Sequence, residues 1–117
     1  MVIINMEKGM SAFNKNKLLS LVNNDEEFLN ELIHDYLEDI SQKLTALNKA
    51  FFKKDIHKIQ NIARSLLGSS ENMTTNELLT AAKQLEYAAK IGDLILGAYY
   101  LNKIENLLDE IKEAFGV

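Results

Sequence analysis

The residues best suited to chemistry in this chain are its two histidines, His34 and His57, and its single arginine, Arg64. A neutral imidazole can accept a proton or a phosphoryl group near pH 7. A guanidinium stays protonated and has no lone pair, so Arg64 can bind carboxylates or other anions but cannot act as a nucleophile. The histidines lie far apart without metal-ligand spacing, and we expect no metal site and no cofactor.

Arg64 lies in the run Ile62-Ala63-Arg64-Ser65-Leu66-Leu67-Gly68-Ser69-Ser70-Glu71-Asn72-Met73. We place this run on a helical wheel with 100° per residue and put Ala63 at the centre of the side that faces the core. One face of the helix is then predicted to be exposed. This face comprises His57, Gln60, Arg64, Gly68 and Glu71, bordered by Leu67. A glycine inside a helix costs about 0.5–1 kcal/mol relative to alanine. The missing side chain of Gly68 would open space beside Arg64 for an approaching molecule.

The elements that position this face are all predicted to be helices, because proline is absent and only five glycines occur. Apolar residues recur at steps of three and four over about residues 15–22, 25–51, 56–73, 76–91 and 94–115. The expected N-caps are Asn14, Asn24 or Asp25, Asp55, Thr74 with Glu77 in a capping box, and Asp93. Short connections make consecutive helices antiparallel. We therefore expect an all-α, up-down-up-down antiparallel four-helix bundle with a short N-terminal capping helix.

Length and composition limit the classes of protein to consider. The 117 residues predict one domain, with a tail over 1–12 and the bundle over 13–117. No cysteine is present, which excludes disulfides and thiolate metal sites and fits a cytoplasmic protein. No apolar run is long enough for a membrane span or signal peptide. The net charge of −4 argues against nucleic-acid binding. Without a long exposed apolar stripe, we expect a monomer that binds other proteins.

The run around Arg64 resembles the signature of histidine-containing phosphotransfer (HPt) domains, Ala-His-x-Leu-Lys-Gly-Ser-Ser/Ala-x-Asn. The matching residues are Ala63, Leu66, Gly68, Ser69, Ser70 and Asn72, with Asp55 nine residues before Arg64 and Leu85-Glu86 in the next helix. Phe13 and the segment 18–38 are also similar to the family's opening segment, so the resemblance covers about residues 13–115. The chain departs from the family pattern at the two positions that take part in phosphotransfer. Arg64 occupies the phosphoacceptor position, and Leu67 occupies the position of a lysine that the family uses to favour the phosphoryl group.

The resemblance implies a degenerate member that lacks the phosphoacceptor histidine and is not an enzyme. Its partner would be a response-regulator receiver domain or a histidine kinase in a two-component phosphorelay. Arg64 would enter the carboxylate-rich pocket of a receiver without reacting, with Gln60, Leu67, Gly68 and Glu71 completing the partner-binding surface.

Other interpretations stay open from the sequence. Arg64 is equally compatible with a solvated side chain or an ion pair to Glu71, and Leu67 with a half-buried core residue. His57 could carry phosphate instead, although it lies about 10 Å from position 64 and is followed four residues later by Asn61 rather than glycine. The chain could also be a purely structural or dimerising helical bundle.

Overall fold

A computed structural model of the chain describes residues 15–71 and 76–115. These residues form α2 (Lys15–Leu21), α3 (Glu26–Phe52), α4 (Ile56–Ser70), α5 (Asn76–Ile91) and α6 (Leu94–Phe115). The expected boundaries are reproduced to within a few residues, and Met73, placed at the end of the helix over 56–73, lies outside the described residues. No helix in the described ranges is long and apolar enough to cross a membrane.

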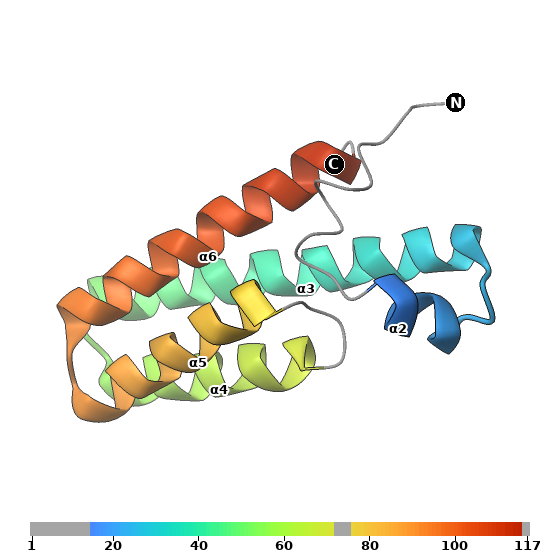
Figure 1. Cartoon of the computed structure of the whole chain (residues 1–117). Helices are drawn as coiled ribbons and strands as arrows, with labels where there is room; N and C mark the ends of the chain where they lie inside the picture. Colours follow the sequence, from blue (N-terminus) through green and yellow to red (C-terminus); the bar gives the residue numbers. More distant parts are fainter. Residues whose placement is uncertain (1–14, 72–75, 116–117) are drawn as a thin grey trace.

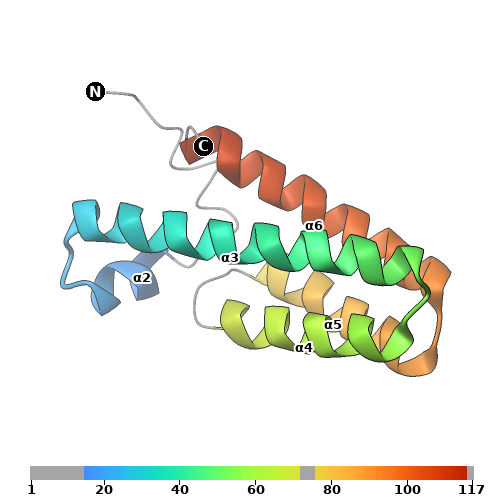
Figure 2. The same ribbon diagram turned by 180° about the vertical axis from the view of Figure 1, so that it is seen from behind.

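The four long helices form an antiparallel bundle, and the short α2 lies near the start of α3 (Figure 1, Figure 2). Around the bundle, α3 contacts α4 and α6, and α5 contacts the same two helices. The short helix α2 contacts α3. The predicted all-α, up-down-up-down bundle with a short N-terminal helix is therefore confirmed.

Aspartate side chains cap the N-termini of three helices, as the sequence predicts. The Oδ1 atom of Asp25 accepts a hydrogen bond from the backbone N–H of Phe28 at 3.1 Å. In the same way, the backbone N–H of Lys58 donates to Oδ1 of Asp55 at 3.1 Å, and that of Leu96 donates to Oδ1 of Asp93 at 3.0 Å. Each side chain satisfies an N–H group that the first helical turn leaves unpaired. The caps proposed at Asn14 and at Thr74 lie outside the described residues.

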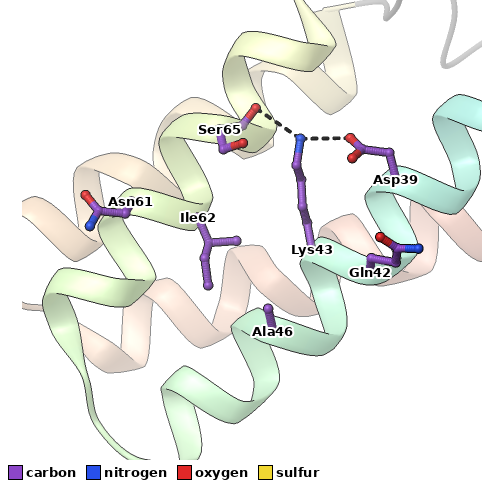
Figure 3. Close-up of a pocket in the computed structure, with 7 residues that line it drawn as sticks. All are labelled: Asp39, Gln42, Lys43, Ala46, Asn61, Ile62 and Ser65. Atoms are coloured by element: carbon purple, nitrogen blue, oxygen red, sulfur yellow. Dashed lines mark hydrogen bonds and ion pairs between the residues drawn. The ribbon is translucent and has the colours of Figure 1, made fainter.

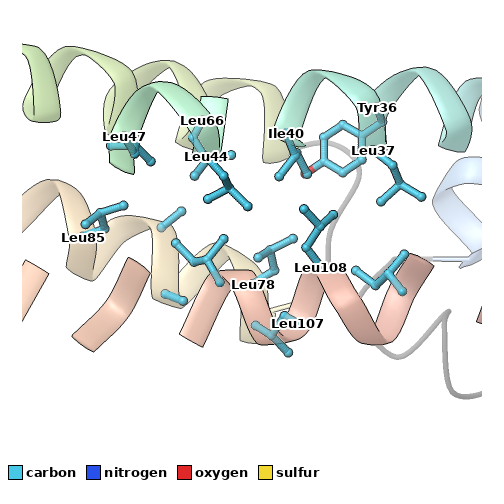
Figure 4. Packing of buried hydrophobic residues seen from close by; sticks show 14 of the residues in the cluster. Tyr36, Leu37, Ile40, Leu44, Leu47, Leu66, Leu78, Leu85, Leu107 and Leu108 are labelled. Atoms are coloured by element: carbon cyan, nitrogen blue, oxygen red, sulfur yellow. The ribbon is translucent and has the colours of Figure 1, made fainter. Parts of the chain in front are cut away.

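A single apolar core fills the bundle (Figure 4). It includes the predicted stripe of α3, whose buried members are Leu29, Ile33, Tyr36, Leu37, Ile40, Leu44 and Leu47. At two positions within the predicted apolar ranges the burial is incomplete. Ile56, assigned to the stripe of α4, is 37% exposed because it is the first residue of its helix. Phe51 is only partly buried against the core, near the end of α3.

Candidate functional site

Arg64 lies on the outer surface of α4, and its side chain is 62% exposed. Its Nε donates to Oε1 of Glu86 on α5 at 3.3 Å, so the ion pair joins neighbouring helices. The alternative pairing with Glu71 is therefore not the one that the structure contains. Position 71 lies two turns along the same helix, about 10 Å away, whereas α5 runs directly beside α4. An ion pair this exposed contributes little to stability, so Arg64 can exchange its partner at low cost.

Open space surrounds Gly68, one turn beyond Arg64. Among residues 15–71 and 76–115, a Cβ atom built on Gly68 would meet nothing within 4 Å outside its own helical neighbourhood. Glu71 is also exposed, and Leu67 is half-buried against the core. We call Arg64, Leu67, Gly68 and Glu71 the arginine face. Because Gly68 carries no side chain, another molecule can approach the backbone of α4 closely here.

Gln60 is less accessible than the helical wheel predicts. The wheel places it on the exposed face, but the structure leaves this residue largely covered and only partly exposed. The wheel gives the angle of a residue around its own helix and says nothing about how far the neighbouring helices wrap around it. Gln60 can therefore contribute less surface to the arginine face than we expected.

Lys43 of α3 brings to this region a second cation that the sequence analysis missed. Its Nζ lies 2.7 Å from Oδ2 of Asp39, one turn earlier on α3, and 3.2 Å from Oγ of Ser69 on α4. A longer contact of 3.5 Å reaches the backbone oxygen of Ser65. The spacing of Asp39 and Lys43 signals the ion pair in the sequence. It does not signal the reach to α4, because that depends on how the two helices pack.

A shallow pocket of about 370 Å³ lies between α3 and α4 beside Lys43 (Figure 3). Its lining residues are Asp39, Gln42, Lys43, Ala46, Asn61, Ile62 and Ser65. Helix α4 contacts both α3 and α5. Lys43 reaches α4 from α3, whereas Arg64 extends from α4 toward Glu86 of α5. Leu67 itself carries no charge. Lys43 of α3 places an ammonium group at Ser69, the residue that follows Gly68.

The end of α4 that carries Gly68 is tied to α3 by a buried hydrogen bond. The hydroxyl of Tyr36 donates to Oγ of Ser70 at 2.7 Å. Burial raises the pKa of Tyr36 to about 12; the hydrogen bond with Ser70 opposes this rise and nearby Asp39 adds to it. The phenol is therefore neutral at physiological pH and remains a donor. This contact holds the last turn of α4, and with it the arginine face, in place.

Neither histidine joins the arginine face. His57 is exposed in the first turn of α4, two turns before Arg64, and His34 is exposed on α3. Within residues 15–71 and 76–115, no group of three or more histidine, cysteine, aspartate or glutamate side chains is arranged to hold a metal ion. The chemistry that the arginine face offers is the binding of carboxylates or other acceptors by a guanidinium.

Among solved structures, the chain is similar to the crystal structure of histidine-containing phosphotransfer protein B (HptB) from Pseudomonas aeruginosa PAO1. The TM-score is 0.79 at 24% sequence identity, and the match covers 90% of this chain and 91% of that chain. No family model matches the sequence, and no curated protein matches it. The structural likeness shows that the chain has the helical-bundle fold of that phosphotransfer protein over nearly its whole length.

Proposed function

We propose that this chain is a non-catalytic, HPt-like adaptor of a two-component phosphorelay that binds a response-regulator receiver domain or a histidine kinase. The observation that carries the proposal is the exposed guanidinium of Arg64 beside the open space at Gly68. The family resemblance of the sequence assigns the phosphoacceptor position to Arg64. A permanently protonated group there can dock but cannot receive a phosphoryl group.

The fold supports a role in a phosphorelay, because the similar protein from Pseudomonas aeruginosa is a phosphotransfer protein by name. The geometry supports docking at the arginine face. Arg64 is held by an exposed ion pair with Glu86, which a receiver's carboxylates can replace. The guanidinium offers parallel N–H groups that match a carboxylate, and the half-buried Leu67 adds an apolar contact at the edge.

The competition between Glu86 and a partner's carboxylates gives the proposal a mechanism. In the free adaptor, Glu86 keeps the guanidinium over the surface of α4. On docking, Arg64 turns from Glu86 into the acidic pocket of the receiver. The adaptor then occupies the pocket that a phosphorylated histidine would otherwise enter, and so competes with phosphotransfer.

A phosphotransfer assay separates this proposal from an active carrier. Radiolabelled, phosphorylated receiver domains and kinases from the same genome are mixed with the wild type, Arg64→His, and His57→Ala. We expect no label on the wild type and label on Arg64→His. Label on the wild type that is lost in His57→Ala would contradict the proposal and make His57 the phosphoacceptor.

A binding assay separates the adaptor from a purely structural bundle. The affinity of each receiver is measured by calorimetry for the wild type, Arg64→Ala and Arg64→Lys. Loss of a bidentate, charge-assisted contact costs more than about 1.4 kcal/mol, so Arg64→Ala should weaken binding at least tenfold. Arg64→Lys keeps the charge but not the paired N–H donors of the guanidinium. Its affinity for the receiver should lie between those of the wild type and Arg64→Ala. If no receiver or kinase binds the wild type, the chain is not such an adaptor.

A further inference from the structure

Exposed aliphatic and aromatic side chains gather at the end of the bundle where α3 meets α4 and α5 meets α6. Phe52, the last residue of α3, is 89% exposed, and Ile95, near the start of α6, is 87% exposed. Ile91 at the end of α5 and Ile56 at the start of α4 are 53% and 37% exposed. The two connections lie side by side, because a Cβ on Gly92 would lie 3.8 Å from Cδ1 of Ile56.

This apolar end is surrounded by positive charge, although the chain as a whole carries −4. The exposed lysines here are Lys49, Lys53, Lys54, Lys58 and Lys90. The acidic residues within 49–58 and 90–95 are Asp55 and Asp93, and the carboxylate of each accepts the capping hydrogen bond of its helix. We call these lysines, with Phe52, Ile56, Ile91 and Ile95, the lysine end.

The opposite end of α3 has the reverse charge. Glu26 and Phe52, the first and last residues of α3, are separated by about 40 Å at 1.5 Å per residue. Residues 18–31 contain four acidic residues and no lysine or arginine. Exposed apolar side chains are present here too, with Leu21 at 60% and Phe28 at 51%. We call Leu21, Phe28, Asp25, Glu26, Glu27 and Glu31, all of them exposed, the acidic end.

We infer that the lysine end of one copy of this chain docks against the acidic end of a second copy. Each end presents apolar side chains surrounded by charge, and the charges of the two ends are opposite. An anionic membrane would match the lysine end alone, whereas a second copy matches both ends with groups that the chain itself carries. Opposite charges across an interface attract the partners and set their orientation, while the apolar contacts hold them together.

The two surfaces differ, so this contact is heterologous and leaves one unused end of each kind on every pair. The assembly is therefore an open chain of copies that grows with concentration. The sequence-based expectation of a monomer rests on the lack of a long apolar stripe. Two short patches at opposite ends agree with monomers at low concentration and with association at high concentration. The contact uses neither Arg64 nor Gly68, so it can fail while the proposed function holds, and the reverse.

Sedimentation of the full chain across a range of concentrations tests the inference. At low ionic strength the average mass should rise with concentration above the 13.3 kDa of the single chain. It should fall toward the monomer value at about 0.5 M salt, where the Debye length is only about 4 Å and the attraction between the charged ends is screened. A wild type that stays monomeric at all concentrations and low salt overturns the inference. Co-sedimentation of that monomer with phosphatidylserine vesicles would assign the lysine end to an anionic membrane instead.

Two double variants decide which surfaces meet. Phe52→Ser with Ile95→Ser alters the lysine end, and Leu21→Ser with Phe28→Ser alters the acidic end. All four side chains are more than half exposed, and circular dichroism verifies the fold of each variant. Each variant alone should stay monomeric, while an equimolar mixture should form a dimer of twice the chain mass and nothing larger. A dimer formed by either variant alone, or a mixture that remains monomeric, overturns the head-to-tail contact.

Discussion

Replacement of Gly68 by alanine separates the structural from the functional meaning of the open space on α4. A Cβ at this position meets no other group within 4 Å in the part of the chain that the structure describes, so the substitution introduces no clash there. Alanine is favoured over glycine in a helix by about 0.5–1 kcal/mol, and Gly68 lies in the last turn of α4, where the lower half of this range applies. We expect Gly68→Ala to raise the free energy of unfolding by about 0.5 kcal/mol and Tm by about 2–3 °C.

Gly97 of α6 provides the matched control. The same gain in helix propensity applies there, but a Cβ would lie 2.9 Å from Cζ and 3.1 Å from Cε1 of Phe51. The phenylalanine ring must move to admit the methyl group, and this displacement offsets the gain. We therefore expect Gly68→Ala to be the more stable of the two alanine variants.

Urea unfolding followed by circular dichroism measures both variants, and calorimetry with the receiver measures binding. If a partner approaches the backbone of α4 at Gly68, the added methyl group should weaken binding while stability rises. Stability lost in Gly68→Ala would refute the structural reasoning, because it would mean that the position is occupied. A gain in stability with unchanged receiver affinity would refute the use of this space in docking.

Three further predictions concern the contacts around the arginine face. Tyr36→Phe removes the buried hydrogen bond to Ser70 and should lower the free energy of unfolding by about 1 kcal/mol, as measured by urea unfolding. Because the pKa of Tyr36 is raised to about 12 from an unfolded value near 10, stability is fully present below pH 10 and should fall as pH rises from 10 to 12. Thermal unfolding at several pH values should show this loss in the wild type, and Tyr36→Phe should lack it. Glu86→Gln breaks an exposed ion pair with Arg64, so stability should change by less than about 1 kcal/mol, whereas receiver affinity should rise because the guanidinium is released.

The periodicity of the sequence predicts most of the fold, because helical spacing and N-caps are local properties. Asp55 and Asp93 cap the helices for which they were assigned, and Asp25 is the one of its two candidates, Asn24 and Asp25, that caps α3. The errors fall at helix ends and between helices. Ile56 fits the apolar spacing of α4 but is exposed at its first turn, and Gln60 is more covered than its angle on the wheel predicts.

The sequence by itself determined that position 64 carries a permanent cation on an outer helix face, since residue type and helical angle suffice for that conclusion. Only the tertiary structure decided that this cation is paired with Glu86, 22 residues away, and that Lys43 of α3 contacts Ser69 of α4. Both contacts join different helices. Their formation depends on how those helices are packed and rotated about one another, which the whole core determines and no local spacing specifies.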